Sequence, residues 1–280
     1  MWLGNGSNLI LQWIFEAFGG PGRRALVPRP SFSLYGMWGR ISETEVEEFP
    51  LGERFEYRAD EVVERIERRS PAITVLCLPN NPTGSELEPA AVGRIALAAE
   101  RAGGILVVDE AYREFSGREF DRTPLARDRQ RLILVRTYSK AFAAAGLRLG
   151  YLLASGALGR ELGKIIPPFH LSQFAAVAGA ALWGERALFA RQAERIVAER
   201  ERLRKALGAV RGLEALPSHA NFFLLRSPDA DGLFNALRER GILVRKPGDD
   251  PALRSLLRVT AGLPEENDRL VRAAREILGA

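Results

Sequence analysis

Three features of the 280-residue sequence predict an α/β fold, with a three-layer αβα domain around a mostly parallel sheet and a smaller α+β domain after it. Short apolar runs rich in Val, Ile and Leu recur between residues 72 and 154, which is typical of parallel strands buried on both faces. Helical patterns separate these runs, as crossover connections require. After residue 155 the sequence changes to long helical patterns, and then to short strands that alternate with helices.

The elements of the large domain follow in chain order. Strands are expected to begin at Ile73, Ile105, Leu132 and Gly150, and the first three are parallel because a crossover helix fits between them. One such helix is predicted over residues 88–104, where it ends at a glycine.

The second half of the chain begins with a helix predicted over residues 186–210, where apolar residues recur at helical spacing. Pro217 then marks the predicted boundary between a large domain, residues 1–216, and a small domain, residues 217–280. Strands in the small domain are expected over residues 221–226, 242–246 and 256–262, and helices over residues 231–240 and 264–278.

Composition and charge exclude several classes of protein. A single cysteine, Cys77, and two histidines leave no internal disulfide and no zinc site of Cys and His. The net charge is +5, but basic and acidic residues are mixed along the chain, which favours an Arg-rich surface over a nucleic-acid partner. No apolar run is long enough to span a membrane, and the first residues do not resemble a signal peptide. We therefore expect a cytoplasmic protein without a membrane partner.

Polar side chains follow each of three successive predicted strands. Asn81 lies in the turn PNNPTG, Asp109 comes directly after four apolar residues, and Lys140 lies in TYSKAF. In an open α/β sheet the ligand binds beyond the carboxyl ends of the strands, so we expect these groups to meet there. Pyridoxal phosphate needs such a set: a lysine that binds its aldehyde, a carboxylate at its ring nitrogen and a donor to its phenolate oxygen. The segment GNGSN, from Gly4, opens a helical stretch that can present N–H groups to the phosphate.

These motifs closely resemble those of the fold-type I pyridoxal-phosphate aminotransferases of class I/II. The resemblance spans almost the whole chain, and the motifs come in the order found in the family. They are GNGS at Gly4, PSFSLY at Pro30, PNNPTG at Pro79, VDEAY at Val108, RTYSKAFAAAGLRLGY at Arg136, ANF at Ala220, GILVR at Gly241 and LRVTAG at Leu257.

The resemblance implies a role for each matching residue. Lys140 would bind the cofactor covalently and move a proton during catalysis, while Asp109 would pair with the ring nitrogen. Asn81 and Tyr112 would bind the phenolate oxygen, and Phe32 would stack on the ring where a tyrosine is more usual. The other implied cofactor contacts, all around the phosphate, are Thr137, Ser139, Arg148, Gly6, Ser7 and Asn8. The implied substrate contacts are Arg258, Arg245 and Tyr35.

The pattern is most like that of histidinol-phosphate aminotransferases. It implies histidine biosynthesis with glutamate as amino donor, a phosphorylated keto acceptor and a homodimer. Threonine-phosphate decarboxylases and some aromatic aminotransferases share most of these motifs, and a shortened, inactive remnant is a further alternative. Members of the family carry several tens of residues before GNGS, which begins here at Gly4. We therefore expect the N-terminal part of the small domain to be absent from this sequence.

Overall fold

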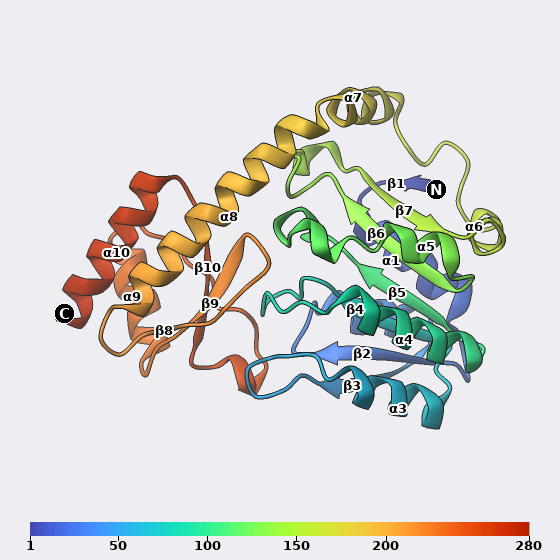
Figure 1. Cartoon of the computed structure of the whole chain (residues 1–280), viewed down its shortest axis with the longest axis horizontal. Coiled ribbons are helices and arrows are strands. Elements are labelled where there is room, and N and C mark those ends of the chain that lie inside the picture. Colours follow the sequence, from blue (N-terminus) through green and yellow to red (C-terminus); the bar gives the residue numbers. More distant parts are fainter. Residues whose placement is uncertain (280) are drawn as a thin grey trace.

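The computed structural model describes residues 1–279, which form a seven-stranded sheet covered by helices and a separate three-stranded sheet (Figure 1). The predicted α/β fold with a mostly parallel sheet is confirmed. In sheet order the strands of the large sheet are β1 (Trp2–Gly4), β7 (Gly150–Ala154), β6 (Leu132–Thr137), β5 (Ile105–Asp109), β4 (Ile73–Cys77), β2 (Arg24–Arg29) and β3 (Glu45–Pro50).

Strand direction in the large sheet follows the prediction. Strands β4, β5 and β6 are parallel neighbours, and β2 and β3 extend the parallel part. Strand β7 turns back antiparallel to β6, and β1 pairs antiparallel with β7. Strands β4, β5 and β6 are fully buried, which is why their sequences are almost continuously apolar.

Helices cover both faces of the large sheet. One face packs against α1 (Ser7–Phe18), α2 (Leu34–Ile41) and α6 (Gly156–Gly163), and the other against α3 (Ala59–Arg69), α4 (Pro89–Arg101) and α5 (Thr123–Asp128). Helix α3 shows why these segments are helical. It has acidic residues in its first turn, basic residues in its last and two buried apolar residues, Val62 and Ile66, one turn apart.

Two long helices lead away from the large sheet. Helix α7 (Gln173–Gly184) runs along one side of the molecule, and α8 (Arg186–Gly208) crosses to the smaller unit (Figure 1). Helix α8 confirms the prediction over residues 186–210. Short 3₁₀ turns complete the connections: η1 (Arg113–Phe115), η2 (Arg118–Phe120), η3 (Ala145–Leu147) and η4 (Pro251–Leu253).

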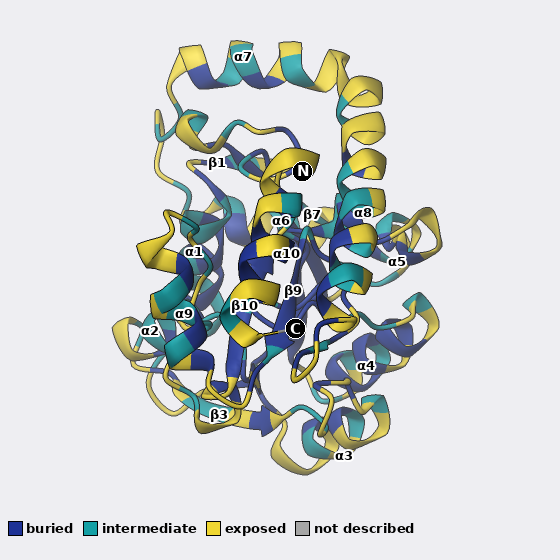
Figure 2. Ribbon diagram, turned by 90° about the vertical axis from the view of Figure 1, so that its left-hand side faces the viewer, coloured by how far each residue is buried: buried dark blue, intermediate teal, exposed yellow. Residues whose placement is uncertain are grey.

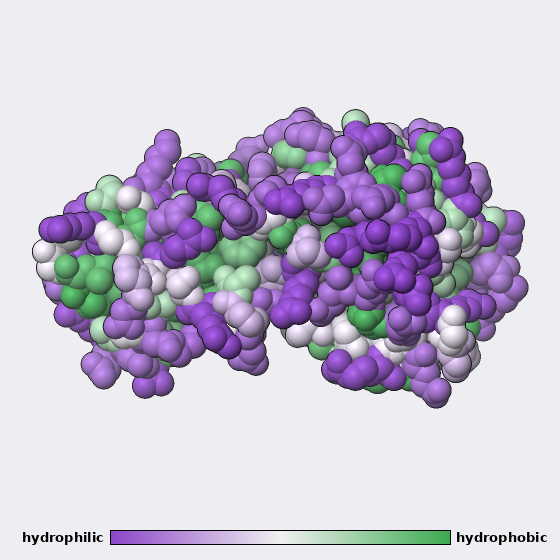
Figure 3. Space-filling view, turned by 90° about the horizontal axis from the view of Figure 1, so that it is seen from below, coloured by the Kyte–Doolittle hydropathy of each residue, from purple (hydrophilic) through white to green (hydrophobic). Residues whose placement is uncertain are grey.

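The smaller unit is an antiparallel sheet in the order β10 (Leu256–Thr260), β9 (Phe222–Arg226) and β8 (Glu214–Ala215). Helices α9 (Ala230–Glu239) and α10 (Pro264–Leu278) pack on it together with the end of α8, through residues such as Leu207, Leu237 and Leu257. In the space-filling view of Figure 3 hydrophobic patches lie among polar side chains on this unit, at the left.

Two expectations for this region need correction. The segment 242–246 is not a strand: only Arg245 pairs with β10, through an isolated bridge to Arg258. The small sheet also begins before Pro217, because β8 pairs with β9. A strand of two residues has no recognisable alternation, which is why the pattern did not reveal it. No helix within residues 1–279 combines the length and apolar character needed to cross a membrane.

Candidate active site

The three polar motifs meet at one edge of the large sheet. The strands end in register, with Cys77 of β4 beside Asp109 of β5 and Asp109 beside Val135 of β6. The small unit reaches the same edge, because Arg258 Nη1 of β10 donates to Asn81 Oδ1 at 2.7 Å. The site therefore lies between the two sheets and takes side chains from both.

Asp109 is a buried carboxylate at the base of this site, with 3% of its surface exposed. Within residues 1–279 its hydrogen-bond donors are two neutral groups, the Tyr35 hydroxyl at 2.8 Å and the Ala111 N–H at 3.2 Å. Burial raises the pKa of Asp109 to about 6, although both hydrogen bonds oppose the rise. A buried carboxylate without a cation is costly, so this position is suited to a protonated ring nitrogen.

Lys140 lies in the loop after β6, next to the buried residues Ala141 and Phe142, and its Nζ lies 5.2 Å from the centre of the Tyr112 ring. Partial burial lowers the pKa of Lys140, and the charges of Arg258, Arg245 and Arg148 lower it further, against the pull of Asp109. A lower pKa raises the fraction of neutral amine, which is the form that attacks an aldehyde and accepts a proton.

Tyr112 and Asn81 face the same space from two neighbouring loops. The Tyr112 ring is buried edge-on against Phe222 of β9, with centres 5.0 Å apart. Burial raises the pKa of Tyr112 to about 12, so its hydroxyl stays protonated and can donate a hydrogen bond. Asn81 is half-buried, whereas its neighbour Asn80 is fully buried and bonds Pro30 O and Thr83 Oγ1. Asn80 thus stabilises the turn, and the Asn81 side chain is the one that faces the site.

The start of α1 forms a cradle for an anion. Gly6 precedes the helix at φ 85°, no side chain caps the first turn, and that turn has no acidic residue. Glycine adopts this positive φ without strain, and it leaves room for the guanidinium of Arg148, because a Cβ at Gly6 would lie 2.7 Å from Nη2. The free N–H groups begin at Ser7 and Asn8, the first two residues of α1. This arrangement suits a phosphate.

Ser139 and Thr137 lie beside Arg148 on the other wall of the cradle. The Ser139 N–H donates to Thr137 Oγ1 at 3.1 Å, and Arg148 Nη1 lies 3.5 Å from Ser139 Oγ. Thr137 is buried, whereas Arg148 is exposed. The structure therefore brings together all the residues that the motifs predicted around the phosphate.

The two aromatic residues of PSFSLY occupy different positions. Phe32 is half-buried and lies edge-on to Tyr35, with ring centres 5.7 Å apart. Tyr35 is only 1% exposed, and its hydroxyl lies on Asp109. A side chain that is sealed behind Asp109 cannot touch a substrate, so the structure does not support the predicted substrate contact of Tyr35. The motif placed it near the site, but no signal in the sequence distinguished its depth.

Arg258 and Arg245 form the cationic wall on the side of the small unit. Their backbones exchange two hydrogen bonds, of 2.7 and 3.1 Å, so their side chains leave the same face of the sheet. The Arg258 guanidinium lies 4.8 Å over the Phe222 ring, and its buried Nε lacks a partner within the described residues. Two like charges directly opposite each other are unfavourable unless an anion binds between them.

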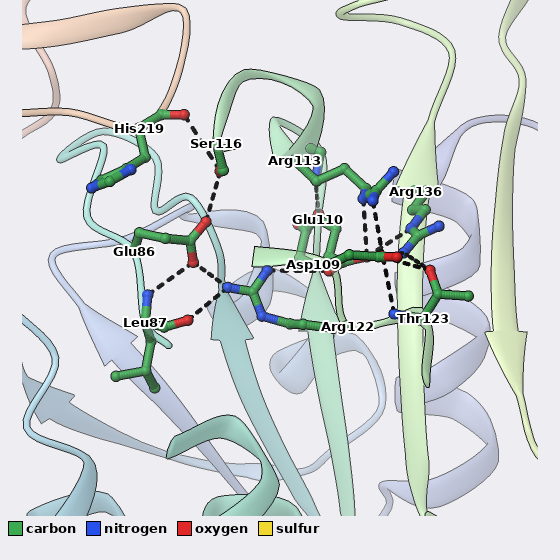
Figure 4. A network of polar contacts seen from close by, with 12 residues as sticks. Glu86, Leu87, Asp109, Glu110, Arg113, Ser116, Arg122, Thr123, Arg136 and His219 are labelled. Carbon is green, nitrogen blue, oxygen red and sulfur yellow. Dashed lines mark hydrogen bonds and ion pairs between the residues drawn. The ribbon is translucent and has the colours of Figure 1, made fainter. Parts of the chain in front are cut away.

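A buried ionic network, which the sequence analysis missed, lies behind the site (Figure 4). Glu110 accepts from Arg136 Nε at 2.7 Å and Arg122 Nη1 at 3.2 Å, and Arg122 also pairs with Glu86. These groups join the ends of β4, β5 and β6. Glu110 directly follows Asp109 at the end of a buried strand, and that position was the available signal.

The network also reaches the small unit. Ser116 Oγ donates to Glu86 Oε2 at 2.7 Å and lies 3.5 Å from the backbone carbonyl of His219. Close by, Gly84 of PNNPTG has φ 76°, and a Cβ there would lie 2.0 Å from Ser218 Oγ. Glycine is therefore needed where the PNNPTG turn meets the entry to the small sheet.

Pyridoxal phosphate fits these residues. The uncapped start of α1 with Arg148 suits its phosphate, and the unpaired carboxylate of Asp109 suits its ring nitrogen. Lys140, with its lowered pKa, suits its aldehyde. The site thus offers a complementary group to each end of the cofactor.

Comparisons with known proteins agree with this arrangement. Residues 1–273 match the family "Aminotransferase class I and II". A histidinol-phosphate aminotransferase of Methylibium petroleiphilum is 40% identical over 278 residues, which are 99% of this chain and 74% of that protein. A histidinol-phosphate aminotransferase of Frankia casuarinae is 43% identical, and the match covers 98% of this chain and 68% of that protein.

Two solved structures show the same fold. Histidinol-phosphate aminotransferase of Sinorhizobium meliloti, in complex with pyridoxal-5'-phosphate, has a TM-score of 0.90 at 24% identity, over 99% of this chain and 76% of that one. L-threonine-O-3-phosphate decarboxylase of Porphyromonas gingivalis has a TM-score of 0.86 at 26% identity, and the match covers 99% of this chain and 83% of that one. Together with the family match, these findings show that the chain belongs to the class I and II aminotransferases and is a pyridoxal-phosphate-dependent transaminase.

Proposed function

We propose that the chain is a histidinol-phosphate aminotransferase (EC 2.6.1.9), which moves an amino group from glutamate to imidazole-acetol phosphate and yields histidinol phosphate and 2-oxoglutarate. The relatives described above carry this name. The observation that supports it best is the pair Arg245 and Arg258, whose side chains share one face beside Asn81. Paired guanidinium groups suit the carboxylate of one substrate and the phosphate of the other.

We further propose the following roles for the chain's own residues. When bound, pyridoxal phosphate supplies an aldehyde and a ring that withdraws electrons. Lys140 would bind the aldehyde in the absence of substrate. After its release by the substrate's amino group, its Nζ would take a proton from the substrate α-carbon and donate it to the carbon that carried the aldehyde. Asp109 would keep the ring nitrogen protonated. Asn81 and Tyr112 would hold the phenolate oxygen, and Phe32 would cover one face of the ring.

The remaining proposed contacts bind the two charged ends. Thr137, Ser139 and Arg148 would hold the cofactor phosphate together with the start of α1, where the contributing residues are Gly6, Ser7 and Asn8. Arg258 would exchange its bond with Asn81 for one with the substrate, because its guanidinium already lies at the mouth of the site. Arg245 would add a second charge there.

Borohydride reduction tests the attachment. Reduction of the holoenzyme, followed by peptide mapping, is expected to place the cofactor on Lys140, and an unlabelled Lys140 would contradict the proposal. Steady-state rates with histidinol phosphate, phenylalanine and threonine phosphate then separate the alternatives. We expect kcat/KM to be highest for histidinol phosphate. Release of carbon dioxide from threonine phosphate would favour a decarboxylase, whose fold the chain also resembles.

A homodimer forms part of this proposal. Helix α7 stands apart from the body of the molecule, with exposed residues along it (Figure 2). Phe174, Val177 and Trp183 of this helix are 78%, 65% and 45% exposed, which is unusual for large apolar side chains in an isolated monomer. A second copy of the chain would cover them. Light scattering at micromolar concentration is expected to give twice the mass of the chain, and a monomer mass would contradict the dimer.

Two broader assignments belong to the same proposal. The chain would work as two domains, a large one that binds the cofactor and a small one that carries Arg258. The predicted division at Pro217 is then moved to just before β8, because Glu214 and Ala215 pair with β9. A cytoplasmic location also belongs to the proposal, because the relatives described above are named for the metabolism of a small phosphorylated molecule. Cell fractionation would test it.

A further inference from the structure

Tyr35 is among the most deeply buried large side chains of the molecule, yet it ends in a polar group at the site. It belongs to α2 and packs in the core on one face of the large sheet, among residues of α1 and β4. Its hydroxyl donates to Asp109 Oδ2 at 2.8 Å. Because an apolar ring of the same size would fill the core equally well, the hydroxyl needs a separate explanation.

Tyr35 also touches a second group at the site. Its ring meets the Phe32 ring edge-on, with centres 5.7 Å apart and planes at 81°. Aromatic pairs prefer this geometry, in which the edge of one ring faces the other. One buried side chain therefore links the carboxylate proposed to hold the ring nitrogen with the aromatic ring proposed to cover the ring face.

We propose that Tyr35 is a positioning residue that holds Asp109 as a charged, correctly oriented carboxylate and fixes Phe32 beside it. The proposal rests on the proposed function, because it assumes that Asp109 meets the cofactor nitrogen. A carboxylate can accept about four hydrogen bonds. The Tyr35 hydroxyl and the Ala111 N–H occupy one position on each oxygen, so the others remain for the cofactor.

The hydroxyl should matter most at acidic pH. Desolvation raises the pKa of Asp109, and the hydrogen bond from Tyr35 is the largest effect that lowers it again. The other titratable groups near Asp109 are Glu110, Lys140, Cys77 and Tyr112, and the substitution of Tyr35 by Phe changes none of them. A hydrogen bond to a charged group corresponds to roughly tenfold in an equilibrium constant. Loss of the hydroxyl should therefore raise the pKa of Asp109 by about one unit.

Tyr35→Phe in the full chain tests the proposal, with Tyr57→Phe as matched control. Tyr57 is a second buried tyrosine, but its hydroxyl bonds the backbone of Cys77, at 2.9 Å to the carbonyl oxygen. The measurement is the affinity of the cofactor-free chain for pyridoxal phosphate between pH 5 and 8.5. The cofactor titrates identically in each experiment, so the ratio of wild-type to variant affinity reports on the protein.

For Tyr35→Phe we expect this ratio to be smallest at pH 8.5, where only the lost orientation acts, and to be about tenfold larger at pH 5, where Asp109 is also more protonated. For Tyr57→Phe the ratio should not change with pH. A ratio for Tyr35→Phe that is constant with pH would show a purely structural residue and overturn the proposal. In a second readout, ¹³C NMR of the cofactor-free chain should show the Asp109 carboxyl titrating at higher pH in Tyr35→Phe. An unchanged titration would also overturn it.

Two controls complete the design. Circular dichroism checks folding, and if Tyr35→Phe does not fold, NMR of wild-type protein replaces it. A slowly exchanging Tyr35 hydroxyl proton that broadens as Asp109 is protonated supports the proposal, whereas a rapidly exchanging one contradicts it.

To test the proposed function separately, a sample of wild-type holoenzyme is first reduced with borohydride. An unlabelled Lys140 would refute the proposed function itself, whereas a labelled Lys140 with a pH-independent ratio would refute only the role of Tyr35.

Discussion

Asp109→Asn should make the cofactor-free protein more stable while it abolishes tight cofactor binding. Asp109 is ionised at neutral pH although it is buried and lacks a cation among the described residues. Asparagine keeps the shape, and its side chain can still satisfy both neighbours: its oxygen accepts from the Ala111 N–H, and its amide donates to the Tyr35 oxygen. The substitution therefore removes a buried charge and keeps one hydrogen bond to each of the two neighbours.

The magnitude follows from the pKa of Asp109, which rises from the usual 3.8 to about 6 in the folded chain. One pKa unit corresponds to about 1.4 kcal/mol, so ionising this buried group costs about 3 kcal/mol of folding free energy. The sign follows from proton binding. Below pH 3.8 both states are protonated and there is no cost. Between these pKa values only the folded chain keeps its proton, and above pH 6 the cost is complete.

The assay is urea denaturation of the cofactor-free chain from pH 4 to pH 8. Asp109→Asn is expected to exceed wild type by as much as about 3 kcal/mol at pH 8, and the difference should fall toward zero at pH 4. Asp121→Asn provides a control, for which we expect the free energy of unfolding at pH 8 to fall rather than rise. Burial acts to raise the pKa of Asp121, but hydrogen bonds from Thr123 and the charge of Arg113 lower it overall. Equal stability of Asp109→Asn and wild type at pH 8 would refute the reasoning.

Three further substitutions test other parts of the site. Gly6→Ala is expected to weaken pyridoxal phosphate binding at least about tenfold in a fluorescence titration, because residue 6 has a positive φ and its Cβ would lie 2.7 Å from the Arg148 guanidinium. Unchanged affinity would contradict the proposal that the phosphate binds at the start of α1. Arg122→Met should lower the free energy of unfolding by urea by about 3 to 5 kcal/mol, because it leaves the buried Glu86 and Glu110 without this partner. A decrease of less than about 1 kcal/mol would contradict this expectation and show that the network rearranges. Arg258→Lys should raise KM for glutamate about tenfold or more with a smaller change in kcat, since an ammonium cannot form a planar two-bond contact with a carboxylate; a larger fall in kcat than rise in KM would contradict a binding role.

The parts of the fold that the sequence predicts best are those in which a single pattern decides the structure. Strands β4, β5 and β6 are buried on both faces, so their apolar runs and the polar residues that end them were readable directly. Asn81, Asp109 and Lys140 were predicted together because parallel neighbours end at one edge. The cradle at Gly6 was readable from its glycines at the start of a helix.

Other features depend on contacts between distant residues. The depth of Tyr35 is set by the packing of α2 on the sheet, and nothing in PSFSLY separates a residue that faces the site from one behind it. The ionic network joins Glu86, Glu110 and Arg122 from three loops. Glu86 and Arg122 look like ordinary surface charges in sequence, and only Glu110 stands at the end of a buried strand. Strand β8 exists only because β9 pairs with it.

The central claim is tested most directly by the visible absorption of the holoenzyme when glutamate is added alone. A transaminase that holds its cofactor on Lys140 is predicted to lose the visible band as the amino group passes to the cofactor, and to regain it when imidazole-acetol phosphate is added. Ping-pong kinetics would accompany this behaviour. A spectrum that glutamate leaves unchanged, in protein whose Lys140 carries the cofactor, would contradict the account.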